Sequence, residues 1–432
     1  MPADPAPISV LFEPLRIGGL ELAGRLYKAA TAETRSTEDG DVTDELLEFY
    51  EPMAQAGTPM IITGNMFVAP QGKGHDRQTG IESDRRIPGL RTLAEMTHRH
   101  GSRIFAQLNH CGRQQAAPAP GFTEAVSASS VREPLLGTKA RPMTVDEIHR
   151  TVHAYAAAAV RAREAGFDGV QLHMSHGYLL SQFLTPHTNR RTDDYGGSFD
   201  GRLRMPLQVL RTVRAAVGDD FPVIAKLNGH DHLPGRAGLD TPALVAIARR
   251  LQDEGLDAVE ISAGHYESGL VAERGRFKGV LRMMLTEGNF RKIAPWRRFM
   301  ARAAAPVLEA AMARMWPPQE GFNLPQAEQF TRELSIPVIC LGGFSSGPAM
   351  AEAIHSGRCD AVSAARAMIA NPLLYRTLRE GVEGPKCAWY NGCLAKWGGK
   401  PVDCYHPEIR RQRDDLLAKH GLTLHVRAST EE

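Results

Sequence analysis

The chain has 432 residues, of which 51 are Lys or Arg and 49 are Asp or Glu, so its formal charge is only +2. A balance this even argues against nucleic acid or a membrane surface as the partner. The opening MPADPAPISV lacks the basic and apolar regions of a secretory signal, and no apolar run approaches the ~18 residues of a membrane span. Six cysteines in so long a chain indicate a reducing compartment, so we expect a cytoplasmic protein.

Short apolar segments alternate with helical segments along the chain. After a hairpin at 15–22, the pattern predicts strands at 25–31, 60–63, 103–108, 169–173, 222–227, 258–262, 337–341 and 361–364. It predicts helices at 43–56, 87–100, 144–166, 204–217, 241–254 and 347–356, and a last one near Leu373. Eight such strands favour a closed (β/α)₈ TIM barrel over an open doubly wound sheet, because no GxGxxG follows the first strand. Periodicity alone leaves the open sheet as an alternative.

Two segments lie outside this alternation. The stretch 265–332, between the sixth and seventh strands, is too long for one crossover and contains a helical patch at 296–315. We expect a long helical insertion there, which is either a lid or substrate-selecting element or a packing or oligomer-contact segment. The expected domains are therefore a barrel over 1–385 and a C-terminal extension over 386–432. The sequence does not set the oligomeric state, and a homo-oligomer is allowed.

Two histidines and a tyrosine follow the predicted fourth strand. His173 and His176 are three residues apart, and Tyr178 comes after Gly177. In parallel α/β proteins, catalytic groups collect on the loops after the strands. The imidazoles could bind a metal, donate hydrogen bonds to an anionic oxygen or be core residues, but no Asp, Glu or Cys at a fixed short spacing completes a metal site. We therefore predict no metal, and a phenol beside two imidazoles suits polarisation and protonation of a carbonyl compound.

Polar residues and glycines also follow other predicted strands. Lys226 ends the fifth strand and could be a Schiff-base nucleophile, a cation beside an anion or an ion-pair partner. Gln107 ends the third strand with an amide that can donate and accept. After the seventh and eighth strands, where barrels bind phosphate, the chain has Gly342, Gly343, Ala365 and Arg366, although a tight turn would also explain the glycines.

Taken together, these motifs resemble the old yellow enzyme family of FMN-dependent ene reductases. The segments LFEPLRIGGLEL, AQLNHCGR, HMSHGYLLSQFLTPHTNRRTDDYGGSFDGR and ARAMIANP look like the family's opening, third-strand, central and phosphate motifs. The resemblance implies a TIM barrel that binds FMN, takes electrons from NAD(P)H and reduces the activated C=C bond of an α,β-unsaturated carbonyl compound. The expected partner is therefore a small-molecule substrate.

The resemblance also implies a role for each candidate residue. His173 and His176 would hydrogen-bond the substrate's carbonyl oxygen, and Tyr178 would protonate the neighbouring carbon. Gln107 would hold the pyrimidine edge of the flavin, with Lys226 near its N1 and O2. The FMN phosphate would be held by Gly342, Gly343, Ala365 and Arg366, and the flavin ring would meet backbone groups of Ala30, Thr31 and Gly64.

The sequence departs from the family pattern in three places. Ala32 stands where a Thr or Cys usually bonds the flavin O4, unless Thr31 substitutes for it, and Ala365 stands where Gly is usual. Larger relatives such as 2,4-dienoyl-CoA reductases bind a [4Fe-4S] cluster with four cysteines. This chain keeps only three in that region, Cys387, Cys393 and Cys404, and has Tyr390 at another ligand position. We expect this degenerate motif to be structural and to hold no cluster.

Other functions remain open on the same residues. A dienoyl-CoA reductase-like or an amine dehydrogenase-like enzyme would use the same flavin. A Schiff-base aldolase acting through Lys226, a His-dependent metal lyase and a non-catalytic FMN-binding protein are more distant alternatives. Neither the physiological substrate nor the choice between NADH and NADPH is indicated.

Overall fold

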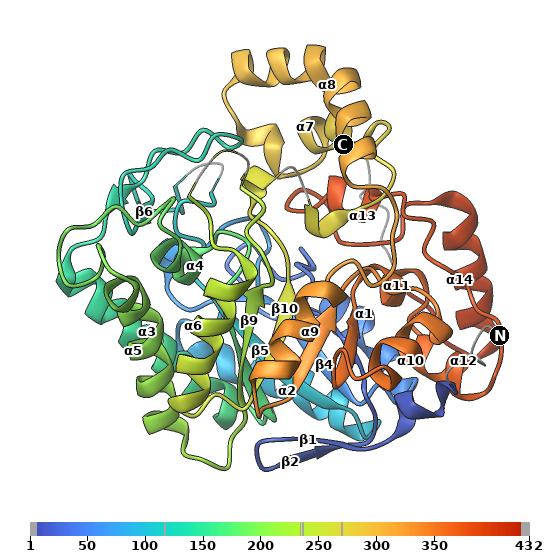
Figure 1. The fold of residues 1–432 in the computed structure, drawn as a ribbon. Helices are drawn as coiled ribbons and strands as arrows, with labels where there is room; N and C mark the ends of the chain where they lie inside the picture. The colour runs from blue at the N-terminus through green and yellow to red at the C-terminus, as the bar shows by residue number, and fades with distance from the viewer. Residues whose placement is uncertain (1–6, 116–117, 234, 236, 269–270, 425–432) are drawn as a thin grey trace.

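Eight parallel strands close into a barrel in the computed structural model, which describes residues 7–115, 118–233, 235, 237–268 and 271–424 (Figure 1). Their order around the barrel is β10-β11-β12-β3-β4-β5-β8-β9. The strands are β3 (Leu26–Lys28), β4 (Met60–Phe67), β5 (Arg103–Asn109), β8 (Gly169–His173), β9 (Val223–Asn228), β10 (Ala258–Ser262), β11 (Val338–Leu341) and β12 (Ala361–Ala364). The predicted (β/α)₈ barrel is confirmed, and the open-sheet alternative is wrong.

Helices pack around the outside of the barrel. They are α1 (Asp44–Gln55), α2 (Ile87–Arg99), α3 (Val145–Glu164), α5 (Phe199–Val217), α6 (Thr241–Asp253), α9 (Leu324–Glu333) and α10 (Gly347–His355). Helix α3 begins with a capping box between Thr144 and Glu147. Helix α5 begins earlier than predicted, because the side chain of Ser198 accepts from the Gly201 N–H and caps the helix there.

The N-terminal hairpin closes one end of the barrel. It consists of β1 (Leu15–Ile17) and β2 (Leu20–Leu22), which pair antiparallel. Ile17 and Leu22 are fully buried against barrel-interior side chains, among them Tyr27, Ile62 and Phe105. This apolar plug fills the amino end of the barrel, which leaves the carboxyl end for a site.

Strand β4 runs four residues beyond its predicted end. Its pairing with β5 shifts register between Ile62 and Asn65, so the segment around Gly64 bulges before the strand resumes. The polar sequence of this bulge interrupts the apolar run from which the shorter strand was predicted.

Two further groups of elements follow strands β10 and β12. After β10 come η4 (Tyr266–Ser268), η5 (Val271–Glu273), α7 (Val280–Thr286), η6 (Asn289–Lys292) and α8 (Pro295–Met315), and Figure 1 shows α8 standing away from the barrel. After β12 come α11 (Arg366–Ala370), α12 (Leu374–Arg379), α13 (Gly392–Ala395) and α14 (Pro407–Lys419). Ala395 of α13 is buried in one apolar cluster with Met284 of α7 and Phe290 of η6. The insertion and the extension therefore pack together.

The remaining short elements connect these parts. They are η1 (Ile8–Phe12), η2 (Pro70–Gly72), η3 (Asp84–Arg86), β6 (Val126–Ser127), β7 (Arg141–Pro142) and α4 (Leu179–Leu184). Among the described residues, no helix combines the length and the apolar character needed to cross a membrane.

Candidate active site

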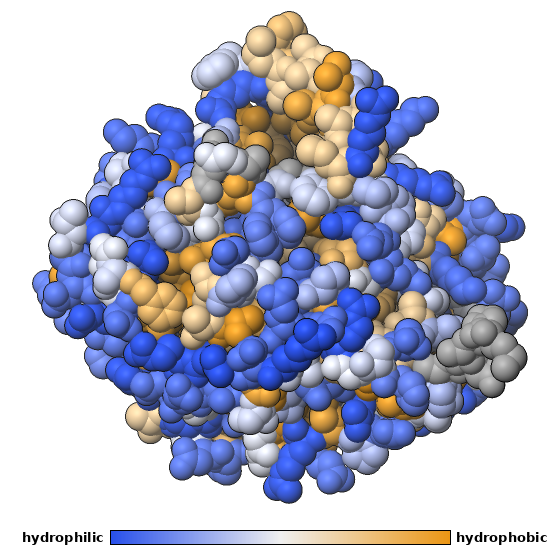
Figure 2. All heavy atoms as spheres, in the orientation of Figure 1, coloured by the Kyte–Doolittle hydropathy of each residue, from blue (hydrophilic) through white to orange (hydrophobic). Residues whose placement is uncertain are grey.

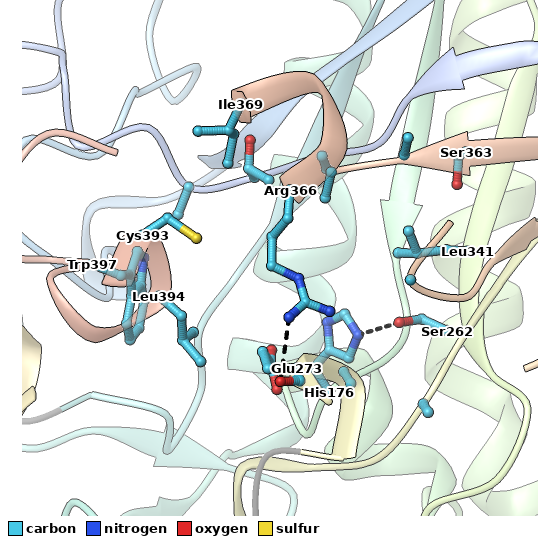
Figure 3. A pocket seen from close by; sticks show the side chains of 18 of the residues that line it. His176, Ser262, Glu273, Leu341, Ser363, Arg366, Ile369, Cys393, Leu394 and Trp397 are labelled. Atoms are coloured by element: carbon cyan, nitrogen blue, oxygen red, sulfur yellow. Dashed lines mark hydrogen bonds between the residues drawn. The ribbon is translucent and has the colours of Figure 1, made fainter. Parts of the chain in front are cut away.

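A cavity of about 230 Å³ lies at the carboxyl ends of the barrel strands, and Figure 3 shows part of its lining. The fold brings most of the predicted site residues together there. Those that line the cavity are Ala30, Thr31, Gln107, His173, His176, Tyr178, Lys226, Gly343, Ala365 and Arg366. The two others, Gly64 and Gly342, lie outside its lining.

The two histidines and the tyrosine form one cluster in the cavity. The ring centroids of His173 and His176 are 5.1 Å apart, and those of His173 and Tyr178 are 4.6 Å apart. The Nε2 atom of His176 lies 2.7 Å from the Oγ of Ser262 in β10 (Figure 3). The backbone of His176 is left-handed, with φ 60°, and pairs with that of His265 in an isolated bridge. The ends of β8 and β10 therefore fix this imidazole from both sides.

Both imidazoles are neutral in this setting. Burial, followed by the positive charge of Lys226, lowers the pKa of His176 to about 3. Burial and then the neighbouring His176 lower the pKa of His173 well below its usual range. A neutral imidazole still donates one N–H, so the pair can bind an oxygen that develops negative charge. Burial raises the pKa of the Tyr178 phenol, which therefore keeps its proton at neutral pH.

A second tyrosine accompanies Tyr178. The hydroxyl oxygens of Tyr178 and Tyr266 are 2.8 Å apart, and the Tyr266 ring also packs edge-on against Trp397. Tyr266 comes from η4 at the start of the insertion, whereas Trp397 comes from the C-terminal extension. Tyr266 was not among the predicted site residues, because a tyrosine in an aperiodic stretch gives no local signal. Its position directly after the sixth barrel strand was the available indication.

Lys226 belongs to a buried polar network across the barrel. Its Nζ lies 3.1 Å from Oε2 of Glu260. The same oxygen accepts from Gln171 Nε2 at 2.8 Å, and the other carboxylate oxygen, Oε1, accepts from Ser363 Oγ at 2.6 Å. Gln107 Nε2 in turn donates to Gln171 Oε1 at 2.6 Å. Because the carboxylate stabilises the charged ammonium, this geometry suits a fixed cation better than a Schiff-base nucleophile.

Thr31 provides a hydroxyl where Ala32 has none. Both residues line the cavity, and Thr31 Oγ1 accepts from the buried Lys28 Nζ at 2.8 Å. Burial lowers the pKa of Lys28 to about 7, against the opposing effect of Glu33. Gly64 lies behind this wall, where its N–H donates to Glu33 Oε1 at 2.6 Å. The Gly64 N–H is therefore used inside the protein and is not one of the backbone groups available to a flavin ring.

The residues after β11 approach the C-terminal extension closely. Gly343 has a positive φ of 69°, and a Cβ on it would lie 2.7 Å from the ring of Trp389. A larger residue would therefore be strained and would collide with that ring. Gly342 faces the backbone of Gly321 instead of the cavity. Gly343 and Ala365 remain as the cavity-facing backbone at this corner.

Arg366 joins three parts of the chain at the cavity edge. Its guanidinium donates to the backbone oxygen of Arg274 at 2.7 Å and to Asn391 Oδ1 at 2.5 Å, and lies 5.1 Å from the ring centroid of Trp389. Figure 3 shows the side chain reaching from the start of α11 toward Glu273. The arginine predicted to hold phosphate thus also links the barrel to the insertion and the extension.

The C-terminal extension forms part of the cavity wall. Cys387, Trp389, Cys393, Leu394, Trp397 and Val402 all line the cavity. The six cysteines of the chain are free thiols, and burial raises the pKa values of Cys393 and Cys404. Among the described residues, no three His, Cys, Asp or Glu side chains are grouped so as to hold a metal ion. A structural role was predicted for this segment, and its contribution to the cavity wall was not predicted.

A closed barrel whose carboxyl end gathers a cation, amides, neutral imidazoles and a phenol defines a barrel enzyme. Within that class the chain belongs to the NADH:flavin oxidoreductase / NADH oxidase family, whose sequence profile matches residues 10–271. This membership confirms the resemblance to the old yellow enzyme family and bears out the expected flavin and nicotinamide.

Individual relatives agree with this assignment. The chain is 33% identical over 391 residues to an NADH oxidase of Thermoanaerobacter brockii, covering 89% of this chain and 53% of that one. It is 32% identical over 392 residues to 4,4'-dithiodibutanoate disulfide reductase of Rhodococcus erythropolis, covering 90% and 93%. The old yellow enzyme homologue from Zymomonas mobilis superimposes with a TM-score of 0.68 at 25% identity, covering 88% and 96%. The chain thus spans about half the length of the first relative and nearly all of the other two.

The residues present fit FMN. The Gln107 amide and the Lys226 cation both line the cavity and belong to one polar network through Gln171 and Glu260, as the polar edge of a flavin requires. Among the hydrogen bonds of the described residues, the N–H groups of Gly343 and Ala365 have no protein acceptor, so they are available to a phosphate. Asn65 also lines the cavity, and its buried Oδ1 has no partner in the described part of the chain. These polar groups would hold the cofactor.

Proposed function

We propose that the protein is an FMN-dependent oxidoreductase that uses NAD(P)H to reduce the activated C=C bond of an α,β-unsaturated carbonyl compound. FMN, when bound, supplies hydride transfer between the nicotinamide and the substrate. The observation that carries the proposal is the cluster of His173, His176 and Tyr178. It places two neutral N–H donors and one protonated phenol within a single cavity.

Each member of the cluster has a distinct task. His173 and His176 donate hydrogen bonds to the carbonyl oxygen, which draws electron density away from the β-carbon and makes it a better hydride acceptor. Tyr178 gives its proton to the α-carbon and so completes the saturated product. The hydroxyl of Tyr266, at 2.8 Å, orients the phenol and can return a proton to it.

The apolar part of the lining indicates the shape of the substrate. It comes from the insertion, the loop before α9 and the extension, and consists mainly of Met284, Phe290, Phe322, Trp389, Leu394 and Trp397. Large aromatic and aliphatic side chains bind a ring or an extended hydrocarbon by excluding water from it. The cavity therefore favours enones that carry a substantial apolar group.

The proposal is tested by measuring the two half-reactions separately in an anaerobic stopped-flow instrument. In Tyr178→Phe, reduction of the bound flavin by NAD(P)H should be nearly unchanged, whereas reoxidation by 2-cyclohexenone should slow by about 10² to 10⁴-fold. Quinones need little protonation assistance, so their reduction should be largely spared. If Tyr178→Phe slows both half-reactions equally, or neither, the phenol is not the proton donor.

The same instrument separates the related reactions. A dienoyl thioester and an amine are offered to the oxidised and the reduced holoenzyme alongside the enone. Rapid reduction of the flavin by the amine would assign an amine dehydrogenase-like reaction. Preference for the thioester over simple enones would assign a dienoyl-CoA reductase-like reaction.

A further inference from the structure

The outer face of helix α8 is apolar and uncovered. Of the ten large apolar side chains that are exposed in the described part of the chain, six belong to this helix, namely Trp296, Phe299, Met300, Val307, Leu308 and Met315. Phe299 is 72% exposed and Val307 is 75% exposed. Figure 2 shows the resulting apolar surface at the top of the molecule, with hydrophilic atoms on its flanks. So large an apolar patch on a single helix indicates a binding surface.

The helix is firmly attached by its opposite face. Ala305 and Glu309 are its buried residues, and the Glu309 carboxylate accepts from the backbone N–H groups of Gly279 and Leu281 at 2.8 Å each. Arg297 near its start donates to the backbone oxygen of Pro134. The helix therefore presents its outer face in a fixed orientation. Trp296, Met300, Ala303 and Val307 follow one another along that face at spacings of three or four residues.

The segment that carries this face is strongly basic. Residues 274–316 contain ten Lys or Arg and two Glu, although the whole chain has a formal charge of only +2. The rest of the chain is therefore net acidic, with 41 basic and 47 acidic residues. Neither Glu of the segment is free for a partner, because Glu309 caps backbone N–H groups and Glu287 pairs with Lys396 at 2.9 Å. We expected no membrane-surface partner from the net charge of the whole chain, but that net charge does not reveal the positive charge of this one segment.

We propose that the outer face of α8 docks on an anionic lipid surface. An apolar stripe flanked by arginines, on a helix that protrudes from the body, can insert its side chains below the headgroups while the cations meet anionic lipids. Arg302 and Arg314 are exposed and have no carboxylate within ion-pair distance among the described residues. They are therefore available to lipid phosphates.

Two other binding partners for the outer face of α8 fit these observations less well. A second copy of the chain would bring the same cations against one another, with no free carboxylate on either helix to neutralise them. A different protein would normally form several hydrogen bonds across such an interface. Within the stripe itself, Trp296, Met300, Ala303 and Val307 offer only the indole N–H for that purpose, and a lipid surface needs none, whereas the flanking Arg302 and Arg314 match its phosphates.

Vesicle flotation of the purified holoprotein tests this proposal. It should float with vesicles of phosphatidylcholine and phosphatidylglycerol, bind pure phosphatidylcholine far less, and be released by salt because the attraction is electrostatic. Phe299→Asp and Val307→Asp should each lower partitioning roughly tenfold or more, because each removes an apolar side chain from the inserted face. Val382→Asp is the matched control, since Val382 is 53% exposed but lies outside the insertion.

The flotation and ultracentrifugation results distinguish a lipid surface from a second copy of the chain as the partner of α8. Flavin content and thermal midpoint are measured for every variant, so that loss of binding is read only from folded protein. If the native protein does not float with anionic vesicles, or if the two aspartate variants float equally well, the proposal is wrong. If ultracentrifugation shows a dimer that Phe299→Asp and Val307→Asp dissociate, the face is covered by a second copy and the proposal is overturned. Both measurements are independent of enone reduction, so failure of the proposed function leaves this test intact.

Discussion

The structure constrains the backbone conformation, the ring position and the charge of His176. The residue adopts a left-handed conformation, its ring contacts Ser262, and burial keeps the imidazole neutral. The neutral imidazole makes the stability of the fold depend on pH, because between the two pKa values the unfolded chain binds a proton that the folded chain does not.

The first prediction concerns this proton. The pKa of His176 falls from an ordinary 6.5 to about 3 in the folded protein. Between those two values the unfolded chain binds more protons, so the free energy of unfolding decreases as the pH falls below 6.5. His176→Asn should remove this contribution, which is about 1–2 kcal/mol between pH 6.5 and about 5. Denaturant unfolding at several pH values measures it, and identical pH dependence in the two proteins would show that the folded imidazole takes up its proton at the same pH as the unfolded chain does.

The second prediction concerns Tyr266. Its hydroxyl contacts that of Tyr178, so Tyr266→Phe should slow enone reduction about tenfold and leave flavin reduction by NAD(P)H unchanged. The solvent isotope effect on the enone step should also change, which a purely structural role would not cause. Tyr195→Phe, whose hydroxyl contacts His149 and Gln208 away from the cavity, is the control. Equal rates for Tyr266→Phe and the native enzyme would exclude a contribution from this hydroxyl.

Among individual residues, the site residues that follow barrel strands could be predicted from the sequence, and those that lie on irregular segments could not. His173, Lys226 and Gln107 could be placed because each ends an apolar run, and parallel strands end together. Trp389 and Trp397 reach the cavity from the C-terminal extension, which packs against the insertion through Ala395 of α13 and Met284 of α7. No local pattern in the sequence encodes that long-range contact.

Among the elements, those with a strong apolar period or a cap were predicted well. Helix α3 has both, whereas α14 was missed because its sequence, PEIRRQRDDLLAK, is charged around most of its circumference. Its buried Arg413 is instead paired with Asp403, a contact that no periodicity reveals. Helices held by ion pairs from distant segments therefore escape pattern-based prediction.

The third prediction concerns the segment around α13. Three cysteines remain there, Tyr390 stands at another ligand position of the larger relatives, and burial disfavours the thiolate form of Cys393 that iron would require. Protein prepared anaerobically should therefore contain less than stoichiometric iron and acid-labile sulfide. About four iron atoms per chain would show that another residue completes the ligand set.

At the scale of the whole molecule, Arg366 holds the barrel, the insertion and the extension together beside the cavity. The fourth prediction follows from its contacts with Arg274, Asn391 and Trp389. FMN should copurify with the native protein. Arg366→Ala should weaken FMN binding by about 1.5–3 kcal/mol if the guanidinium also meets the phosphate.

Two measurements distinguish the roles of Arg366. Flavin fluorescence gives the affinity, and calorimetry of the flavin-free protein gives its stability. If Arg366→Ala lowers the thermal midpoint but leaves the affinity for FMN unchanged, Arg366 only links the barrel to the insertion and the extension. A colourless native protein that cannot be reconstituted with FMN would contradict the proposed function itself.

The hairpin of β1 and β2 closes the amino end of the barrel, so the cavity opens on the carboxyl side. In the proposed function, the nicotinamide and the enone approach the same face of the molecule, and we expect them to bind there one after the other. The expected kinetics are therefore ping-pong, with parallel lines in double-reciprocal plots and with each substrate becoming a competitive inhibitor of the other at high concentration. Intersecting lines would mean that both molecules can occupy the barrel mouth at once.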